Sequence, residues 1–475
     1  MAERLDCDVL IIGSGPGGAT TAAALAEAGR DVLIAEEGED HHVDSAPSYS
    51  LAEMDQKYRS GGLTTALGPT NITYIEGRCV GGASEINAGL YHRPKAETLD
   101  RWARDYGVED MSPEAMWPWF EAIERDMTIS ALPGGVGPAS KKLAAGAAKL
   151  GWGSREVKRF WRYEETTDGK KPQRQSMSET MIPRARAAGA RLSARTRVRK
   201  LIIKGGEARE AVGIRDGRPV RIRFREVFVC CGAVQTPLLL RRSGVTENVG
   251  NDLRLHPMVR VAVRFPEPFN DPSWGVPVQQ VEEFKPALTL GCSHSSLPHI
   301  ALWLEGNPQG GRDALLHRDW ERIGIFYVAA VAEGRGSVRS LPIFDDPLVR
   351  FKMTDGDLKL VGDGLHKLGQ LLFAAGAEVI FNPLTGGPPV SRPADLDALR
   401  AVQQGNAQVT TIHLFSSCPM GEDRGRCAVD SYGKLHDHKN IWLNDASVLP
   451  HSPGVNPQGT IMSVALRNAA RFLAG

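Results

Sequence analysis

The sequence predicts an α/β fold, in which a domain built on a parallel sheet carries an inserted α+β domain of antiparallel sheet and helices. The first observation is a continuous apolar run at residues 9–12, which a glycine turn and an alanine-rich segment separate from a second run at residues 32–34. Strand, turn, helix and strand in this order build parallel sheets. The second observation is that after about Pro257 short alternating runs are separated by Pro, Gly and Asn clusters, as in antiparallel sheets.

The first unit has the pattern of a Rossmann-like dinucleotide site. Gly13, Gly15 and Gly18 have the spacing G-x-G-x-x-G directly after the first strand and before the alanine-rich helix. This spacing allows a tight turn, brings bare backbone against a pyrophosphate and offers it a helix N-terminus. Glu36 ends the second run, where a carboxylate binds ribose hydroxyls, so FAD or NAD is favoured over NADP. A solvated strand-end charge is the alternative for Glu36.

Composition narrows the classes of partner. The 475 residues are 42% hydrophobic, enough for a large core and two or three domains, and their formal charge of +1 argues against broad attraction to nucleic acid or anionic membrane. The first strand begins too early in the chain to leave room for a signal peptide, so we expect a cytoplasmic protein. No apolar run has the length of a membrane span, so we expect no transmembrane segment. The seven cysteines lack paired C-x-x-C spacing, which disfavours a disulfide framework, and no metal site is predicted.

Between Glu36 and residue 175 the chain alternates loops and helices. Residues 61–73, rich in Gly and Thr, are expected to form a mobile flap or crossing loop. The following block, residues 77–89, has adjacent glycines and a serine, so its backbone N–H groups and the Ser84 hydroxyl are expected to face a ligand. Helical spacing occupies residues 94–132 and 141–150, and a polar loop is expected up to Pro172.

The middle of the chain returns to the first sheet. A helix is predicted over residues 177–188 and a hairpin from Val198 to Phe224. A strand is predicted over residues 227–231, followed by a small-residue turn and a helix over residues 235–242. This order suits the returning edge of the nucleotide-binding sheet.

The inserted substrate domain follows. Short strands are predicted at residues 259–263, 300–304 and 323–331, and helices at residues 355–375 and 394–404. The expected boundaries give the nucleotide-binding domain residues 1–100, 176–257 and 412–475. The substrate domain then takes residues 101–175 and 258–411.

The last sixty or so residues carry the second informative pattern. His413 lies after a β-rich run and before a Ser/Cys/Pro/Gly loop, which would hold its imidazole at a strand end facing a pocket. A structural histidine is the alternative. A strand ending at Asp445 and Ala446, followed by a turn into a terminal helix near Gly459, predicts a second helix N-terminus that stabilises negative charge.

Together these blocks resemble the glucose-methanol-choline (GMC) family of FAD-dependent oxidoreductases, from Asp8 to the end of the chain. Residues 77–100 are similar to the first family signature, with Ala83 where Gly, Ser or Thr is usual. Residues 232–246 are similar to the second, with Thr246 in place of the closing Gly. Residues 250–257 and 365–377 resemble the branch that contains bacterial long-chain alcohol and sterol oxidases.

The resemblance implies oxidation of a primary or secondary alcohol to the aldehyde or ketone by an FAD-binding domain, with oxygen or another electron acceptor. His413 would accept the hydroxyl proton while hydride passes to flavin N5, and Asn456 would hold the substrate oxygen. Some relatives attach the flavin through a His where this chain has Ile86, so noncovalent FAD is expected. The implied cofactor contacts are Gly13, Ser14, Gly15 and Gly18 at the pyrophosphate, Glu36 at the ribose, Val198 at adenine, and Arg78, Gly81, Gly82, Ser84, Asn87, Ala88, Asp445, Ala446, Pro457 and Gln458 along the flavin side.

Two other functions stay open. One is a flavoenzyme of another reaction class, such as a monooxygenase or an isomerising sterol-type oxidase, and the other is a non-catalytic nucleotide-binding protein. Trp274, Trp303, Phe326 and Tyr327 are candidates either for a substrate pocket or for core packing. If His413 is structural, His451 is the next candidate base.

Overall fold

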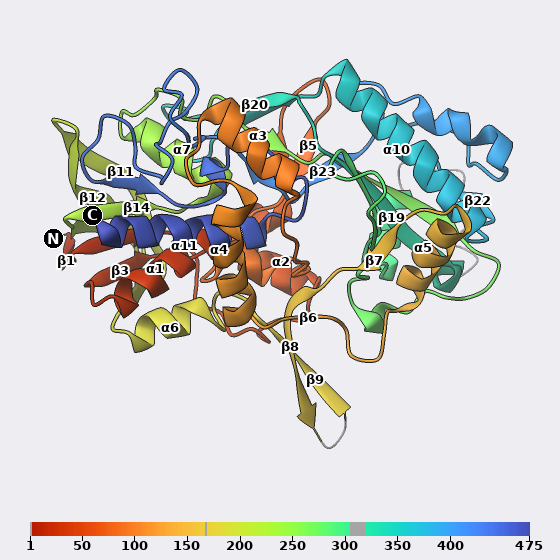
Figure 1. Ribbon diagram of the computed structural model, residues 1–475, viewed down its shortest axis with the longest axis horizontal. Coiled ribbons are helices and arrows are strands. Elements are labelled where there is room, and N and C mark those ends of the chain that lie inside the picture. Colours follow the sequence, from red (N-terminus) through yellow and green to blue (C-terminus); the bar gives the residue numbers. More distant parts are fainter. Residues whose placement is uncertain (1, 167–168, 305–318) are drawn as a thin grey trace.

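The computed structural model describes residues 2–166, 169–304 and 319–475, and the chain forms two lobes (Figure 1). One lobe holds both termini and the parallel sheet. The other holds the long helix α10 (Asp355–Ala374) beside a large, mainly antiparallel sheet. Among the helices within the described residues, none combines the length and apolarity needed to cross a membrane.

The centre of the first lobe is a five-stranded parallel sheet in the order β10–β3–β2–β14–β25. Helix α1 (Pro16–Glu27) packs against both α6 (Met181–Ala187) and α11 (Gln458–Ala474). All residues of the two central strands β2 and β3 are buried, which explains their continuous apolar runs. The predicted Rossmann-like α/β fold is confirmed. The strands are β2 (Val9–Ile12), β3 (Val32–Ala35), β10 (Arg191–Ser193), β14 (Glu226–Val229) and β25 (Ile441–Leu443).

A four-stranded sheet lies beside it, in the order β1–β13–β12–β11. The predicted hairpin from Val198 is the antiparallel pair β11 and β12, which continues into β13, and β1 adds in parallel. Helix α7 (Gly232–Arg242) packs against β11. The bounds are β1 (Glu3–Asp6), β11 (Thr196–Lys204), β12 (Glu207–Arg215) and β13 (Arg218–Arg223).

Helices α3 (Ala96–Tyr106) and α4 (Pro113–Asp126) belong to the first lobe by their packing. Trp102 and Phe120 are fully buried in the same core as the parallel sheet, and α4 packs against α11. The expected boundary had assigned residues after 100 to the substrate domain. The apolar stripe of α4 packs against the terminal helix, a partner that the sequence pattern alone could not identify.

The second lobe is built on a nine-stranded sheet in the order β4–β5–β23–β16–β19–β18–β17–β7, with β22 paired to β16. Alternate residues of β16, such as Val259 and Val261, pack into a core with α10 and α5 (Pro138–Lys149). The strands are β4 (Thr64–Ala66), β5 (Ile72–Tyr74), β7 (Ser154–Glu156), β16 (Met258–Arg264), β17 (Gln279–Val281), β18 (Leu288–Cys292), β19 (Ile323–Ala330), β22 (Val379–Ile380) and β23 (Val409–Thr411).

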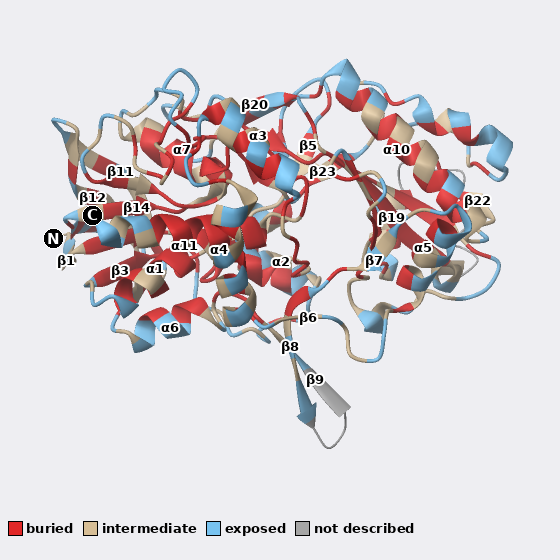
Figure 2. Cartoon of the chain, in the orientation of Figure 1, coloured by how far each residue is buried: buried red, intermediate tan, exposed pale blue. Residues whose placement is uncertain are grey.

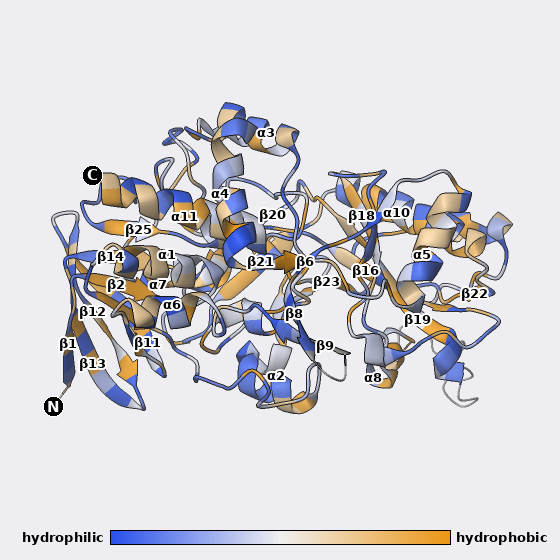
Figure 3. Cartoon of the chain, turned by 60° about the horizontal axis from the view of Figure 1, so that its bottom comes forward, coloured by the Kyte–Doolittle hydropathy of each residue, from blue (hydrophilic) through white to orange (hydrophobic). Residues whose placement is uncertain are grey.

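Burial and hydropathy follow this arrangement. Buried residues fill the centres of both lobes (Figure 2). In Figure 3 the edge strand β25 of the parallel sheet is apolar, whereas β8, in the projecting hairpin, is hydrophilic. The remaining strands and short helices are α2 (Leu51–Lys57), β6 (Ile129–Ser130), β8 (Arg159–Thr166), β9 (Gly169–Arg174), β15 (Arg254–Leu255), α8 (Leu297–Leu304), β20 (Arg335–Arg339), β21 (Leu348–Lys352), β24 (Leu414–Phe415), and the 3-10 turns Arg59–Gly62, Gly82–Glu85, Pro272–Trp274, Asp319–Arg322, Pro393–Arg400 and Ala446–Val448.

Several local predictions were wrong. Residues 300–304 lie in helix α8 rather than a strand, because a short apolar run has no periodicity that separates the two. The expected loop at residues 61–73 contains β4 and β5, which join the edge of the large sheet. The expected polar loop before Pro172 contains the β8–β9 hairpin, and residues 394–404 hold a 3-10 turn instead of an α-helix.

Candidate functional site

A cavity of about 1350 Å³ lies between the parallel sheet and the nine-stranded sheet. Its walls include Ile12 and Ala35, at the carboxyl ends of β2 and β3, and Met258 and Val409 from the large sheet. Ligand sites usually enclose roughly 300–1,000 Å³. This cavity therefore has room for a ligand larger than a typical small molecule, or for two ligands side by side.

The three glycines of the first turn have different surroundings. Gly13 has a φ of +99°, and a Cβ there would stand 2.4 Å from the carbonyl oxygen of Cys230. A Cβ on Gly18 would stand 2.0 Å from the carbonyl oxygen of Gly13. Gly15 lines the cavity with an ordinary φ of −65°, and a Cβ on it would meet no atom of the described residues within 4 Å. Gly13 and Gly18 thus serve the fold, whereas Gly15 leaves free space at the cavity wall.

Glu36 is buried at the same end of the cavity. Its Oε2 accepts hydrogen bonds from the backbone N–H of Ser14 at 3.0 Å and from the Ser14 hydroxyl at 2.7 Å, and its Oε1 accepts from Gly38 N–H at 2.8 Å. Burial raises the pKa of this carboxyl, and the hydrogen bonds from Gly38 and Ser14 act in the opposite direction. The side chain is held in place by the turn that it faces.

Two helices begin at the cavity without a side-chain cap. Gly15 precedes α1 and Pro457 precedes α11, and both line the cavity. Uncapped N-termini present free N–H groups and the positive end of the helix dipole, which favour phosphates and anionic rings. The free space at Gly15, the fixed carboxylate of Glu36 and these two N-termini fit a dinucleotide cofactor such as FAD.

The block at residues 77–89 is divided between cavity and support. Gly82, Asn87 and Ala88 line the cavity. Gly81 instead donates its N–H to the Ser14 hydroxyl at 3.0 Å, and Arg78 is exposed. The Ser84 hydroxyl, expected to face the ligand, donates to the Gly81 carbonyl at 2.7 Å and accepts from the N–H of Met177, so it fixes the turn.

The other predicted cofactor contacts come together from distant segments. Val198, Asp445, Ala446, Pro457 and Gln458 all line the cavity. The Gln458 side chain accepts a hydrogen bond from the Asn87 amide at 2.6 Å, which joins the first signature block to α11.

Asp445 is buried and accepts from the N–H groups of Gly232 and Ser447 at 2.8 and 2.7 Å. Its carboxylate therefore holds the start of α7 beside the cavity. Burial raises the pKa of this carboxyl, while hydrogen bonds, including those from Ser447, lower it.

His413 and Asn456 lie together at the other end of the cavity. Nε2 of His413 is 3.4 Å from the Asn456 amide nitrogen, and both residues line the cavity wall. Burial, assisted by the charge of Arg260, lowers the pKa of His413 to about 4. The imidazole is therefore neutral at pH 7 and able to accept a proton.

A second histidine that the sequence pattern did not single out supports the first. His256 Nδ1 lies 3.0 Å from His413 Nδ1, and its Nε2 contacts the Ser452 hydroxyl. His256 belongs to the segment 250–257, whose resemblance to one branch of the family was the available signal. Burial lowers the pKa of His256 well below its usual value.

Asn456 is itself oriented by a buried polar chain. Its Oδ1 accepts from the Gln280 amide at 3.5 Å, and the same amide donates to the Tyr327 hydroxyl at 2.9 Å. The Gln280 oxygen accepts from Lys285 Nζ at 3.2 Å. Lys285 also pairs with Glu282 at 2.7 Å. No sequence motif identified these residues, because each is linked to Asn456 by side-chain hydrogen bonds that form only in the folded protein.

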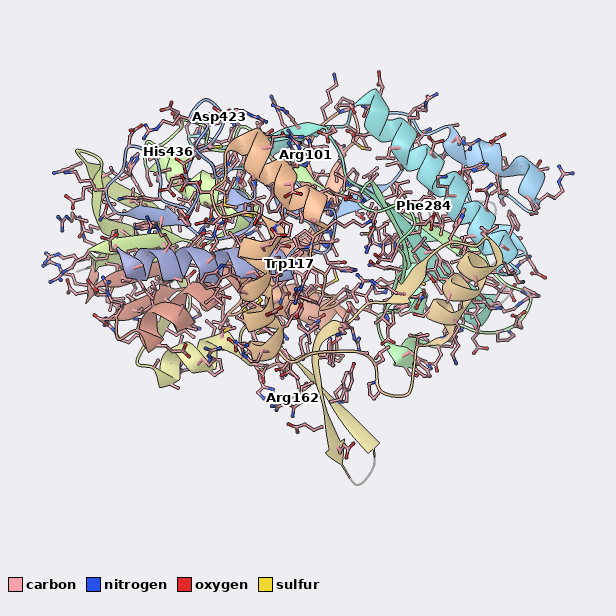
Figure 4. All side chains as sticks on the ribbon, viewed as in Figure 1. Arg101, Trp117, Arg162, Phe284, Asp423 and His436 are labelled. Carbon is pink, nitrogen blue, oxygen red and sulfur yellow. The ribbon has the colours of Figure 1, made fainter. Side chains whose placement is uncertain are left out.

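The alternative base, His451, does not line the cavity. Its Nε2 lies 3.3 Å from Glu333, which also pairs with Arg101 of α3 at 3.2 Å; Arg101 is labelled in Figure 4. This pairing joins α3 to the loop before β20. The geometry favours His413 over His451 as the group that meets a ligand.

Of the four aromatic candidates, Trp303 and Tyr327 line the cavity, whereas Phe326 is buried in the core of the second lobe and Trp274 is exposed. Phe326 and Tyr327 are neighbours on β19, so they point to opposite faces of the sheet.

Comparison with known proteins gives three family matches. Residues 54–258 match the N-terminal model of the GMC oxidoreductases and residues 332–465 match the C-terminal one. Residues 8–57 match a model described as an FAD binding domain. The first region carries the residue 77–89 block, and the second carries His413 and Asn456.

Whole-chain relatives agree. The GMC-type oxidoreductase y4nJ of Sinorhizobium fredii is 38% identical, with 99% of this chain and 95% of that protein aligned. The long-chain-alcohol oxidase FAO4A of Arabidopsis thaliana is 25% identical over 97% of this chain and 68% of that protein. Among solved structures, pyridoxine 4-oxidase from Mesorbium loti has a TM-score of 0.77 at 20% identity, over 99% of both chains, a likeness of fold.

Proposed function

The chain belongs to the GMC oxidoreductase family of FAD-dependent enzymes that act on CH–OH groups, and from this premise we propose that it oxidises a primary or secondary alcohol to the aldehyde or ketone. His413 is the base that takes the hydroxyl proton. The observation that carries the proposal is the pairing of His413 Nε2 with the Asn456 amide at 3.4 Å in the wall of the cavity.

The proposed cofactor contacts follow the cavity wall. The turn at Gly15 and the start of α1 hold the pyrophosphate, Glu36 holds the adenosine ribose, and the start of α11 faces the ring system. When bound, FAD supplies the acceptor for the hydride that leaves the carbinol carbon. Ile86 lines the cavity with a hydrocarbon side chain that cannot form a bond to the flavin, so noncovalent binding is proposed.

The hydrogen bonds assign a tautomer to His413. Because Gln280 donates to the Asn456 oxygen, the Asn456 amide nitrogen is turned toward His413 and donates to Nε2. Nε2 is then the unprotonated nitrogen, and Nδ1 carries the hydrogen and donates to His256. His413 therefore presents its unprotonated nitrogen on the side that faces Asn456.

This arrangement prepares proton removal before the substrate arrives. An alcohol whose oxygen accepts from the Asn456 amide places its hydroxyl hydrogen toward Nε2 of His413. As the proton reaches Nε2 the ring becomes cationic, and His256 accepts from its Nδ1–H. The Asn456 amide stabilises the negative charge that develops on the substrate oxygen.

The test is anaerobic mixing of the purified yellow protein with a panel of alcohols, followed by product analysis. Bleaching of the flavin with one carbonyl formed per FAD supports alcohol oxidation. A hydroxylated or isomerised product would assign another reaction class, and flavin that no alcohol bleaches would contradict the proposal. Repeating the reaction with oxygen or an artificial acceptor identifies which one reoxidises the enzyme.

A further inference from the structure

Arg260 stands on the face of the large sheet that lines the cavity. Met258 and Arg260 of β16 both line it, whereas the alternate residues Val259 and Val261 face the core under α10. The alternation of a strand fixes this direction, so the guanidinium is presented to the cavity by the fold.

The partners of Arg260 are all neutral. Its Nη1 donates to the Thr410 hydroxyl at 2.5 Å, its Nε donates to the Ser293 hydroxyl at 3.3 Å, and its guanidinium carbon lies 5.1 Å from the ring centre of Trp303. Within residues 2–166, 169–304 and 319–475, no carboxylate forms an ion pair with it and Nη2 makes no hydrogen bond. Burial lowers the pKa of Arg260 to about 10, which leaves the group cationic at neutral pH.

Three buried arginines, Arg59, Arg254 and Arg467, are compensated differently. A fourth, Arg159, also bonds to a neutral group, the Tyr163 hydroxyl, but it does not line the cavity. Arg59 pairs with Glu37 and Glu76, and Arg254 pairs with Asp252 at 3.1 Å. Arg467 donates to the backbone carbonyls of Glu109, Asp110 and Ser431, which tie it into the fold. Arg260 has neither a carboxylate nor a set of carbonyls among the described residues, and it faces a cavity.

Arg260 is also close to the reacting groups. Thr410, to which it donates, precedes His413 by three residues, and Tyr327, its partner in the β16–β19 register, is bonded to Gln280 beside Asn456. A substrate whose hydroxyl lies between His413 and Asn456 therefore has a cation within the same wall.

We propose that the alcohol oxidised here carries a carboxylate, and that Arg260 binds this carboxylate while His413 faces the hydroxyl. A carboxylate supplies the missing counter-charge and accepts from Nη2 in the plane of the guanidinium. A single negative charge matches a single guanidinium, whereas phosphate is commonly held by several donors. This inference rests on the proposed alcohol oxidation and adds the class of substrate.

The experiment compares acids with neutral analogues on the FAD-loaded enzyme. Omega-hydroxy acids and para-(hydroxymethyl)benzoate are each paired with their N-methylamide, and flavin reduction is followed in anaerobic rapid mixing. We expect kcat/KM for the preferred acid to exceed that for its amide, and Arg260→Gln to lower it by about 10- to 100-fold, mainly through KM. The amide should change by less than about 3-fold, and Arg260→Lys should retain part of the preference.

Arg264→Gln is the matched control. Arg264 lies on the same strand but pairs with Asp319 and Glu378 and does not line the cavity, so both substrates should react as with the wild type. As a second readout, benzoate binding to the oxidised holoenzyme is measured by calorimetry and should be lost in Arg260→Gln.

Two results separate the proposals. If alcohols bleach the flavin but acids and amides react equally, and Arg260→Gln leaves their ratio unchanged, the carboxylate inference is wrong while alcohol oxidation stands. A phosphate ester preferred over the carboxylate would overturn it as well. If no alcohol bleaches the flavin, the proposed function fails, and benzoate binding that depends on Arg260 would still support a carboxylate site.

Discussion

The two ends of the cavity are built from the chain in different ways. At the proposed cofactor end, Gly15, Ser14 and Glu36 lie within one strand, turn, helix and strand unit, and their hydrogen bonds join neighbours in that unit. At the proposed reacting end, His256, His413 and Asn456 come from three separate segments that meet only in the folded protein. Residue spacing within one short segment is enough to predict the proposed cofactor end. The proposed reacting end depends on how two sheets face each other in the folded protein.

The largest effect is expected from Gly15→Val. The valine side chain would occupy space that no atom of the described residues fills and that we assign to the pyrophosphate. FAD retention should therefore be abolished while the fold persists. The measurement is FAD per protein after gel filtration, with circular dichroism to check folding. Gly153→Val, outside the cavity, is the control, and full occupancy in Gly15→Val would overturn the assignment.

The next effect is expected from His413→Ala, which should keep FAD but slow flavin reduction by about two to four orders of magnitude. Only the unprotonated imidazole accepts a proton, so wild-type activity should hold from neutral pH downward and be lost as the pH falls through a pKa of about 4. The pH dependence of rapid-mixing rates checks this. The acid limb should vanish in His413→Ala and remain in His451→Gln; the reverse would make His451 the base.

Glu36→Ala tests the cofactor end without touching the reacting end. Loss of the hydrogen bonds between the Glu36 carboxyl group and the ribose should raise the dissociation constant of FAD by about 10- to 100-fold. At saturating FAD the rate of reduction should match the wild type. Fluorescence titration of the apoprotein measures the constant, and Glu39→Ala, an exposed neighbour, is the control. A variant that binds FAD normally but is not reduced would assign Glu36 to the chemistry.

The sequence predicted the parallel sheet and its turn because β2 and β3 are buried on both faces and therefore carry continuous apolar runs. It also identified His413 and Asn456 as a pair through the family resemblance. It did not identify Gln280, Lys285 or Arg260 as parts of the site. These residues sit in strands and loops of the large sheet, where alternation tells which face a residue occupies but not what lies opposite.

The smallest effect is expected from Gln280→Leu, which tests whether Gln280 orients the Asn456 amide. Gln280 turns the Asn456 amide toward His413, and Lys285 fixes the direction of the Gln280 amide. Without that donor the Asn456 amide can rotate and offer its oxygen to His413, which favours the tautomer with hydrogen on Nε2. The base is then blocked in part of the molecules, and flavin reduction should slow by about 2- to 10-fold, the worth of one neutral hydrogen bond. The adjacent Gln279 is also buried but bonds to Ser154 at 3.0 Å, so Gln279→Leu controls for the loss of a buried amide. Because the defect is one of orientation, the slower rate should persist at saturating substrate and appear in kcat rather than KM. Equal rates in the two leucine variants, or a change confined to KM, would mean that Asn456 holds its orientation without Gln280.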